Sequence, residues 1–394
     1  MPPLRIAHVV STFPPYFGGA GTAAFETAAE LARRGHEVEV FTARTEGTLP
    51  PTGATVHRID PLLAIGNAPL LPPLARIRGF DVLHLHYPFI FGTELLHVAR
   101  LLRRMPLVVS YHNELIGEGL RAPLFAAWER TWGRATLRVA ARVCVVSQLH
   151  AQSVANLRRV AERSPHKLVE IPNGVDLQAF APGPGPALRR AEGIPDDAVV
   201  VAFVSTLDRA HFLKRPDLAI DAVAASGDER VHLLVIGGGE WLERMRQRVT
   251  AVGLADRVTF LGGVGHDRLP DVLRASDALL VTSDRESFGI VLVEGMACGL
   301  PTVSTDPVGV RAVVRPEETG LLAPVGNAGR LGAALRRMAE LGPAGRTAMG
   351  LAGRRLCERH YGWPAVVDRV ETVYAEAVGS SAARRPESSR SSAV

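Results

Sequence analysis

Residues 278–301 read Ala-Leu-Leu-Val-Thr-Ser-Asp-Arg-Glu286-Ser-Phe-Gly-Ile-Val-Leu-Val-Glu294-Gly-Met-Ala-Cys-Gly-Leu-Pro301. The apolar run at the start has the length of a buried strand, and a helix that includes Glu294 is expected to open at Gly289. Glu286 then lies in the loop between this strand and this helix. The unpaired N–H groups at the start of the helix would point at an anion bound above them. Two carboxylates placed in this way favour a polyol ligand, such as a hexose and a ribose.

The same order of strand, loop and helix recurs along the chain. Apolar runs of strand length lie at residues 6–10, 38–42, 82–85, 107–111, 143–146, 199–204, 233–236, 258–261 and 278–281. Segments of helical character lie between most of them, at 22–34 and then from about Pro216, Glu240, Asp267 and Gly289. This alternation predicts an α/β protein with doubly wound parallel sheets.

A run of proline and glycine interrupts the alternation at Ala181-Pro-Gly-Pro-Gly-Pro-Ala187, and the pattern restarts after it. Such a run continues neither a helix nor a central strand, so we interpret 181–187 as a hinge. The length of 394 residues also favours two domains. We therefore predict one domain over 1–180 and a second over 188–360. Residues 380–394 have almost no apolar side chains and are expected to form a disordered tail.

The composition excludes several classes of protein. Hydrophobic residues make up 47% and charged residues 22%, as in a globular domain, and no segment is apolar enough to span a bilayer. Three scattered cysteines, Cys144, Cys298 and Cys357, are too few for a disulfide framework or a zinc site. The N-terminus has no secretory signal pattern, so we expect a cytoplasmic location.

The net charge of +5 suits an anionic ligand, such as a nucleotide, a phosphate or an acidic lipid. Basic and aromatic residues do not interleave, which disfavours nucleic-acid binding. Only Lys167 and Lys214 among the 45 basic residues are lysines. Lys214 and Arg209 follow the first strand of the second domain, where they would face the Glu286 helix. A solvated basic loop is the alternative interpretation of this segment.

Glycines and histidines supply the remaining candidates. Gly18 and Gly19 open a helix after the first strand, where the backbone can approach a phosphate or a sugar; a plain turn is the alternative. Gly239 belongs to a glycine cluster directly after a strand. His112 ends a buried strand of the first domain, a common position both for active-site residues and for structural polar caps.

Taken together, these motifs resemble the retaining, nucleotide-sugar-dependent glycosyltransferases with the GT-B fold (family 4-like). The resemblance covers nearly the whole chain, and the Glu286/Glu294 element with its Phe-Gly and Gly-Leu-Pro flanks is its most specific part. The similar segments are Pro14–Gly21, Arg34–Val38, Asp81–His84, Ile171–Asp176, Lys214, Gly237–Glu240, Phe260–Gly262, Glu286–Pro301 and Thr319–Leu322. The resemblance implies two Rossmann-like domains that face each other across a cleft. It also implies that a C-terminal helix at about 361–379 completes the first domain.

The resemblance implies a role for each candidate. Arg209 and Lys214 would neutralise the donor diphosphate, Glu286 would bind the donor sugar, and His112 would lie beside the reacting carbon. The implied donor-binding residues are Gly18, Gly19, Gly239, Val264, Ser287, Phe288, Gly289, Ile290 and Glu294. The donor nucleotide (UDP, GDP or ADP), the sugar and the acceptor, which could be a carbohydrate, a lipid-linked molecule or a small molecule, stay open.

The sequence departs from the family pattern at three places. Pro307-Val-Gly-Val-Arg-Ala312 lacks the carboxylate that many members have there, Arg215 follows Lys214 where many have glycine, and Thr206 replaces the usual basic residue after the strand. The sequence therefore does not establish that Arg209 takes the role of the usual basic residue. It also leaves the geometry of the phosphate site open.

The chain contains no Asp-x-Asp pair, which many metal-dependent glycosyltransferases use to hold a cation. We therefore expect no metal or other cofactor. Arg209, Lys214 and the helix at Gly289 would stabilise the departing diphosphate instead. Since no residue is well placed as a nucleophile, although Glu286 stays open, we expect a hexosyl unit to be transferred with retention of its anomeric configuration.

Other functions fit parts of the sequence. A nucleotide-sugar epimerase or hydrolase could share this architecture. An oxidoreductase depends only on the weak fingerprint Gly19-x-Gly21-x-x-Ala24. A peripheral membrane protein is a further alternative, because the arginine-rich segment Arg121–Arg142 contains Phe125, Trp128 and Trp132. Contact with the inner face of a membrane would also be compatible with a transferase.

Overall fold

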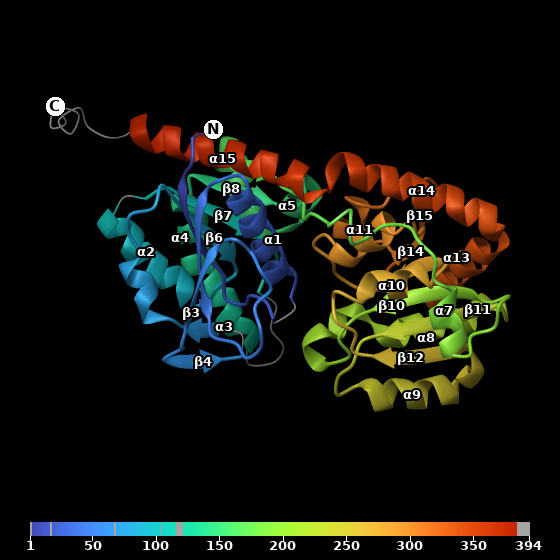
Figure 1. Cartoon of the computed structure of the whole chain (residues 1–394). Helices are drawn as coiled ribbons and strands as arrows, with labels where there is room; N and C mark the ends of the chain where they lie inside the picture. Colours follow the sequence, from blue (N-terminus) through green and yellow to red (C-terminus); the bar gives the residue numbers. More distant parts are fainter. Residues whose placement is uncertain (1, 16–17, 67, 104, 116–120, 384–394) are drawn as a thin grey trace, which may run out of the picture. The chain divides into compact units, whose positions relative to one another are not determined.

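The computed structural model describes residues 2–15, 18–66, 68–103, 105–115 and 121–383. The chain divides into two compact units (Figure 1). Unit 1 contains the residues up to Asn173 and those from Trp363 onward, and unit 2 contains Gly174–Gly362. Each unit has a central parallel β-sheet covered by helices on both faces, which confirms the predicted α/β class.

The sheet of unit 1 has seven parallel strands in the spatial order β3-β2-β1-β6-β7-β8-β9. They are β1 (Arg5–Val9), β2 (Glu37–Ala43), β3 (Thr55–Ile59), β6 (Val82–Tyr87), β7 (Leu107–Tyr111), β8 (Arg142–Val145) and β9 (Leu168–Glu170). The five inner strands were predicted to within two residues at each end. The two edge strands were missed, because β3 is partly exposed and β9 has only three residues, so neither forms a buried apolar run.

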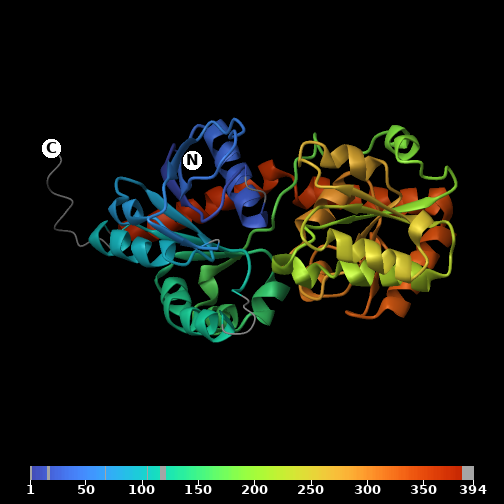
Figure 2. The ribbon, with the colours of Figure 1, turned by 90° about the horizontal axis from the view of Figure 1, so that it is seen from below.

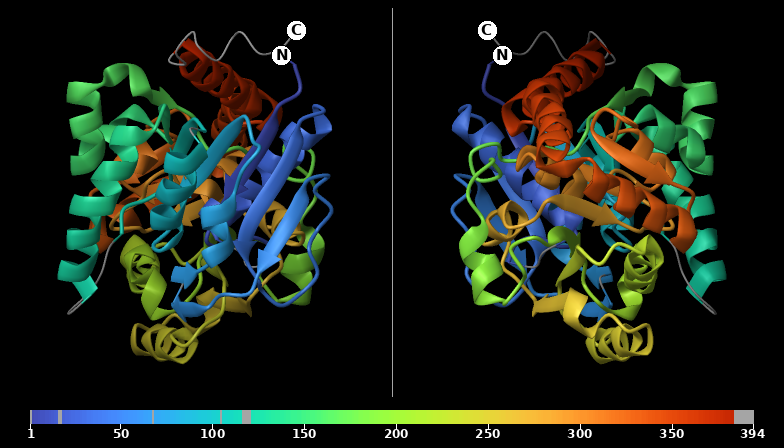
Figure 3. Two further views of the ribbon diagram at one scale, coloured as in Figure 1. Left: turned by 90° about the vertical axis from the view of Figure 1, so that its left-hand side faces the viewer. Right: turned by 90° about the vertical axis from the view of Figure 1, so that its right-hand side faces the viewer.

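Helices cover the two faces of this sheet with separate cores. Helices α1 (Gly19–Arg33) and α15 (Trp363–Ala383) pack on one face, and α15, in dark red, lies along unit 1 in Figures 1 and 3. The opposite core includes side chains of η1, α2, α4, α5 and α6. The remaining elements of unit 1 are β4 (Leu63–Ile65), β5 (Ala68–Leu70), η1 (Pro72–Arg76), α2 (Gly92–Arg103), α3 (Arg121–Trp128), η2 (Glu129–Gly133), α4 (Arg134–Val139), α5 (Gln148–Ser153), α6 (Ala155–Arg163) and η3 (Pro165–Lys167).

The last helix is longer than the sequence indicated. We expected a helix to about residue 379 and a disordered tail over 380–394, but α15 continues to Ala383. The Ser380 hydroxyl donates to the carbonyl of Glu376 one turn earlier, and alanine and serine are tolerated in a helix. Residues 384–394 lie outside the described part of the chain.

A partly buried ionic cluster links α15 to the end of α1. Arg34 donates to the Glu371 carboxylate (2.5 Å) and also to Asp368. His36 accepts from the N–H of Leu4 at Nδ1, so its Nε2–H donates to Glu371 (2.9 Å). Burial alone would raise the pKa of Glu371, but the hydrogen bonds from His36 and Arg34 outweigh it and lower that pKa.

We predict that Glu371→Gln destabilises unit 1 by about 1–2 kcal/mol at pH 7, because it removes the charge from these bonds. A lowered folded-state pKa stabilises the protein above the unfolded-state value of a glutamate and loses this effect as the pH falls through the folded value. The difference in thermal midpoint should therefore vanish in acid. The control Glu376→Gln removes an exposed ion pair from the same helix and should change little. An E371Q effect that is the same at pH 7 and pH 3 would contradict this account.

The sheet of unit 2 has six parallel strands in the order β12-β11-β10-β13-β14-β15. They are β10 (Val199–Val204), β11 (Val231–Ile236), β12 (Val258–Gly262), β13 (Ala278–Val281), β14 (Thr302–Thr305) and β15 (Gly320–Ala323). The first four were predicted, whereas β14 and β15 were not among the predicted strands.

Helices α8, α9 and α13 cover one face of the unit 2 sheet, and Figure 2 shows α8 and α9 side by side. Helices α11 and α14 pack together, and α11 also contacts β13 and β14. The helices of unit 2 are α7 (Pro186–Ala191), η4 (Arg209–Lys214), α8 (Pro216–Ser226), α9 (Leu242–Ala251), η5 (Ala255–Arg257), α10 (Leu269–Arg274), α11 (Ile290–Ala297), α12 (Val308–Arg311), α13 (Ala328–Glu340) and α14 (Gly342–His360).

The proline–glycine segment 181–187 is part of unit 2. Arg274 at the end of α10 donates to the carbonyls of Ala181 and Ala179, both at 2.8 Å. A Cβ on Gly185 would lie 2.1 Å from the Arg274 carbonyl oxygen, so the segment packs closely on α10. The units divide at Asn173/Gly174 and Gly362/Trp363, slightly away from the boundaries expected at 180 and 360. That 181–187 acts as a hinge stays a prediction.

In both units the strand order reverses direction at one point. The chain proceeds from β1 to β2 and β3 on one side and then returns to β6 on the other side of β1; β10 and β13 flank the corresponding point in unit 2. In open α/β sheets, ligands bind outside the carboxyl ends of the strands at such a point. The loops after β1, β6, β10 and β13 are therefore the expected positions for a site.

Candidate functional site

Lys214 and Glu286 meet in unit 2, from the loops that follow the adjacent strands β10 and β13. The Lys214 Nζ donates to Glu286 Oε2 at 2.5 Å. The Glu286 side chain is only 12% exposed and that of Lys214 33% exposed. Two residues that the sequence analysis named as candidates therefore form an ion pair at the carboxyl ends of the strands.

Hydrogen bonds to the backbone fix the loop after β13 against the segment that carries Lys214. The Thr282 hydroxyl, directly after β13, lies 2.7 Å from the Lys214 carbonyl oxygen and 2.8 Å from that of Arg215. The N–H of Asp284 donates to the carbonyl of Leu213 at 2.8 Å. The position of Lys214 is therefore set by the same loop that carries Glu286.

Arg215 occupies the position where many family members have glycine, and its backbone shows why. Its φ of 54° lies in the left-handed region, which costs a residue with a side chain about 1 kcal/mol or more. The guanidinium offsets this cost by pairing with Asp217 and Asp284. The departure from the family pattern thus adds a second link to the Glu286 loop. Sequence reasoning missed both aspartates, although the adjacent Lys-Arg pair was a signal.

The first residues of α12 lie directly against the backbone of the Glu286 loop. The N–H of Gly309 donates to the Glu286 carbonyl at 3.1 Å. A Cβ at Gly309 would lie 2.3 Å from that carbonyl oxygen and 2.4 Å from the carbonyl carbon of Ser287. Only glycine allows this approach. The segment Pro307–Ala312 lacks the carboxylate expected from the family resemblance. It instead packs against the backbone of Glu286 and so helps to fix the position of this residue.

We predict that Gly309→Ala displaces the Glu286 loop and lowers kcat/KM of sugar transfer at least tenfold, since overpacking costs about 1–3 kcal/mol. The control is Gly329→Ala, where the added Cβ meets only ordinary contacts on the exposed side of α13. Steady-state kinetics and thermal unfolding of both variants provide the comparison. Equal kcat/KM for G309A and G329A would show that the close approach has no bearing on the site.

The other predicted residues near α11 are Gly289, Ile290, Phe288 and Glu294, and the structure shows the position or contacts of each. Gly289 is the residue before α11 and has a φ of 84°, and Ile290 begins the helix. Phe288 is buried and packs edge-on against Tyr361, with ring centroids 5.7 Å apart. Glu294 is buried and accepts a hydrogen bond from His266 Nε2 at 2.8 Å. The sequence did not indicate His266.

Ser287 is partly buried and its carbonyl carbon faces Gly309. Val264, in the loop after β12, is also partly buried. Arg209 is exposed at the start of η4, and its N–H donates to Glu240 Oε1 at 3.1 Å. Arg209 thus lies on the same element as Lys214, at its opposite end.

Gly239 has a clear packing role. Its φ is 145°, and a Cβ there would lie 2.3 Å from the Leu207 carbonyl oxygen. The N–H of Leu207 in turn donates to the carbonyl of Gly238. The glycine cluster after β11 therefore lets two backbone loops meet, and a donor-binding role for Gly239 stays a prediction.

In unit 1, α1 begins at Gly19, with Gly18 as the extended residue before it. Gly21 packs against the preceding loop, since a Cβ there would lie 2.8 Å from the Thr12 carbonyl oxygen. The predicted second strand is followed by Arg44, so no carboxylate is present there to bind a ribose. The packing of Gly21 accounts for the weak dinucleotide fingerprint without a nicotinamide ligand.

His112 lies directly after β7 and belongs to a hydrogen-bonded group that extends across the sheet. Its Nε2 is 2.9 Å from His86 Nδ1, and His86 Nε2 is 2.9 Å from His8 Nδ1. Burial lowers the pKa of His112 to about 4 and that of His8 to about 3. It also lowers the pKa of His86 well below the usual value. These imidazoles are therefore neutral at physiological pH.

The same group continues to the C-terminal helix. The Tyr374 hydroxyl on α15 is 3.1 Å from His8 Nε2 and 2.6 Å from His84 Nδ1. His84 Nε2 is 2.8 Å from Ser110 Oγ. The sequence identified His112 at the end of a buried strand but missed His8, Ser110 and Tyr374. A histidine within the buried apolar run of the first strand was the available signal.

The arginine-rich segment proposed for membrane contact is only partly exposed. Trp128 packs against the core of unit 1 and donates its indole N–H to Glu94. Trp132 is 41% exposed. None of the described helices has both the length and the apolar character needed to cross a bilayer.

Two family models match the chain. The model for "Glycosyltransferase Family 4" matches residues 17–179, and that for "Glycosyl transferases group 1" matches residues 186–355. The first match covers unit 1 up to Asn173 and extends into the first residues of unit 2, and the second match lies within unit 2.

The chain is also similar to curated proteins along most of its length. It is 34% identical to the D-inositol 3-phosphate glycosyltransferase of Kineococcus radiotolerans, covering 93% of this chain and 92% of the relative. The protein of the same name from Mycobacterium tuberculosis is 30% identical, covering 93% of this chain and 81% of the relative.

Solved structures show the same fold. Sucrose-phosphate synthase from Thermosynechococcus elongatus superposes with a TM-score of 0.79 at 24% identity, covering 95% of this chain and 99% of that one. Anabaena HepE in complex with UDP-glucose gives a TM-score of 0.76 at 22% identity, covering 94% and 99%. The two parallel-sheet units have the GT-B fold, and the chain belongs to the group 1, family 4-like glycosyltransferases.

Proposed function

We propose that this glycosyltransferase moves a hexosyl unit from a nucleotide-diphosphate sugar to an acceptor hydroxyl, with retention of anomeric configuration and without a metal ion. The observation that carries the proposal is the Lys214–Glu286 pair at the carboxyl ends of β10 and β13. A bound donor would replace the lysine–glutamate contact with two others. Lys214 would bind a phosphate oxygen, and Glu286 would accept bonds from sugar hydroxyls.

The main chemical task is to stabilise the negative charge that develops on the departing diphosphate. Lys214 and Arg209 supply cationic groups, and the N-terminal end of α11 supplies backbone N–H groups with their dipole. Each charge-assisted hydrogen bond contributes about 1.5–3 kcal/mol. The absence of an Asp-x-Asp pair from the sequence supports the proposal that these groups replace a cation.

Retention follows from attack on the same face that the diphosphate leaves. The bond between the anomeric carbon and the phosphate oxygen breaks, and a bond from this carbon to the acceptor oxygen forms. The acceptor proton moves to the departing phosphate oxygen. In this reaction Glu286 orients the sugar and forms no covalent bond with it, and we propose that His112 of unit 1 contributes to catalysis.

The names of similar proteins suggest substrates to test first. HepE has been solved in complex with UDP and with UDP-glucose, and the curated relatives are named for D-inositol 3-phosphate. We therefore propose a UDP-sugar donor and a phosphorylated polyol acceptor. Cys144, Cys298 and Cys357 are buried free thiols, in keeping with a proposed site of action in the reducing cytoplasm.

We predict that Lys214→Ala lowers kcat about ten- to a hundredfold, because one charge-assisted contact to the diphosphate is lost. Lys214→Arg should keep part of the rate. Arg336→Ala removes an exposed cation from α13 and serves as the control. Product formation from UDP-sugars and inositol phosphate would be followed for all variants, and full activity of K214A would remove Lys214 from the site.

Proton NMR of the first-formed linkage should show the anomeric configuration of the donor. Retention gives an α-linked product from an α-linked nucleotide sugar. A β-linked product would exclude same-face attack.

A further inference from the structure

The six groups of the histidine chain form one continuous path across unit 1. In order they are His112, His86, His8, Tyr374, His84 and Ser110. A neutral imidazole donates from one ring nitrogen and accepts at the other, and a tyrosine hydroxyl donates one hydrogen bond. Once the direction of one bond is known, the direction of every bond between ring nitrogens is therefore fixed as well.

The two bonds of Tyr374 indicate the direction. Its hydroxyl is 2.6 Å from His84 Nδ1 but 3.1 Å from His8 Nε2. Hydroxyl donors form shorter hydrogen bonds than N–H donors, at about 2.7–2.8 Å against about 2.9–3.0 Å. The tyrosine thus donates to His84 and accepts from His8.

The rest of the chain follows from this direction. Because His8 carries its proton on Nε2, its Nδ1 accepts from the Nε2–H of His86. His86 Nδ1 then accepts from the Nε2–H of His112. His112 is left with a lone pair on Nδ1, which has no hydrogen-bond partner within the described residues.

We propose that Tyr374, through His8 and His86, fixes His112 as the Nε2–H tautomer, so that its Nδ1 is a hydrogen-bond acceptor for a substrate hydroxyl. Tyr374, His8 and His86 are positioning residues in this scheme. The consequence for sugar transfer rests on the proposed function, whereas the tautomer itself does not. Helix α15 therefore covers one face of the sheet and also, through Tyr374, fixes the tautomer of His112.

A metal ion is the competing explanation for three clustered histidines. Ring nitrogens of His8, His84 and His86 lie within 4.8 Å of one another. However, both nitrogens of each ring already have a partner in the chain of hydrogen bonds. A bound cation would have to displace protons that these bonds share, so the geometry favours a protonic chain.

The direct test uses protein with 15N-labelled histidine rings. Long-range proton–nitrogen correlation spectra report which ring nitrogen carries the proton, and His112→Gln identifies the His112 signals. We expect His112 in the Nε2–H form in the wild-type protein and a mixture of tautomers in Tyr374→Phe. Wild-type His112 protonated on Nδ1, an unchanged tautomer in Y374F, or stoichiometric metal bound to the purified protein would each overturn the proposal.

Kinetics provide a separate readout. Tyr374→Phe should lower kcat/KM for sugar transfer roughly three- to tenfold, the effect of one misdirected hydrogen bond. Tyr111→Phe is the matched control, because this buried hydroxyl in the same unit has no hydrogen-bond partner within the described residues. If the tautomers behave as expected in protein that transfers no sugar, the proposed function fails and the histidine chain stands.

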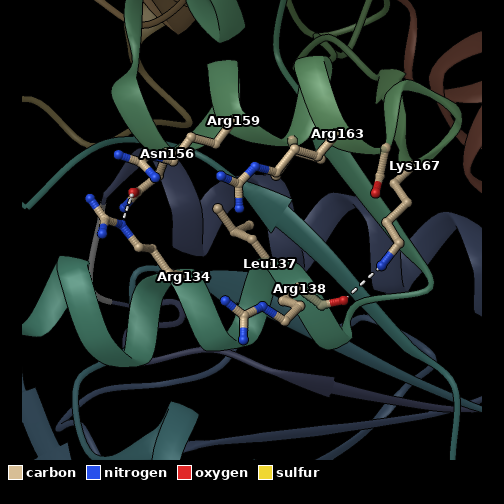
Figure 4. A pocket seen from close by; sticks show the side chains of 9 residues that line it. Arg134, Leu137, Arg138, Asn156, Arg159, Arg163 and Lys167 are labelled. Carbon is tan, nitrogen blue, oxygen red and sulfur yellow. Dashed lines mark hydrogen bonds between the residues drawn. The ribbon is translucent and has the colours of Figure 1, made fainter.

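A second inference rests on a different part of unit 1. A pocket of about 210 Å³ lies between α4 and α6 (Figure 4). Five cationic side chains line it, and no carboxylate is among its lining residues. The cations are Arg134, Arg138, Arg159, Arg163 and Lys167.

The four arginines of this pocket form no ion pair with a carboxylate among the described residues. Arg138, Arg159 and Arg163 form no ion pair with the acidic residues that the structure describes, and Arg134 bonds the neutral Asn156 side chain at 3.2 Å. Like charges gathered in one pocket repel one another, and a bound anion removes this cost. A volume of about 210 Å³ leaves room for a phosphate group and not just for single water molecules.

We infer that this pocket binds a ligand with one or more phosphate groups, at a place separate from the site at the carboxyl ends of the strands. The α4 and α6 helices lead into the amino ends of β8 and β9. His112, in contrast, follows the carboxyl end of β7. A soluble phosphate compound and the phosphate headgroup of a lipid share the required chemistry.

The test compares Arg138→Gln/Arg163→Gln with Arg158→Gln, an exposed arginine on α6 outside the pocket. Calorimetry with pyrophosphate probes a soluble ligand, and sedimentation with phosphatidylglycerol or phosphatidylcholine vesicles probes a lipid. Any phosphate binding in unit 2 is common to all three proteins. We expect the double variant to lose at least tenfold in affinity for one of the two anionic probes while R158Q does not. Equal binding by wild type and both variants to both probes would overturn the inference.

Discussion

The contact between Lys214 and Glu286 depends on the point in unit 2 where the strand order reverses. Because β10 and β13 are neighbours there, the loops that follow them reach the same place although they are 72 residues apart in the chain. The opposite charges lie 2.5 Å apart, and because the Glu286 side chain is only 12% exposed, water screens their attraction less than that of a surface pair. Under the proposed function, a donor would insert between them by offering a phosphate to the lysine and hydroxyls to the glutamate, and this would select for a sugar phosphate.

The supporting residues show how much structure such a pair requires. Thr282 bonds the backbone of Lys214, Arg215 bonds Asp284 in the Glu286 loop, and Gly309 packs against the Glu286 carbonyl. None of them needs to touch a ligand. Preorganised charges stabilise a transition state because they need not reorient as the bond breaks. Unit 1 follows the same principle with neutral groups, since a chain of hydrogen bonds rather than a salt bridge orients His112.

Much of the fold could be predicted from the sequence, because inner strands of parallel sheets are continuous apolar runs. The edge strands β3 and β9 were not predicted, because β3 is partly exposed and β9 has only three residues, so neither forms a continuous apolar run. In the site, Glu286 and Lys214 stand out by residue type and position. Gly309 and Tyr374 do not, since their roles arise from contacts made only in the folded chain; Tyr374 and His84 are 290 residues apart. The left-handed backbone of Arg215 was not predicted either, although the glycine that many family members have at this position was a signal for it.

We propose that fixed side chains and backbone dipoles, rather than a cation, stabilise the departing diphosphate. Initial rates of transfer from a UDP-sugar should be measured in metal-free buffer with a rising concentration of EDTA. We expect the rate to be unchanged, and added Mn²⁺ or Mg²⁺ to alter it less than twofold. Loss of turnover in EDTA that Mn²⁺ restores would contradict the central claim.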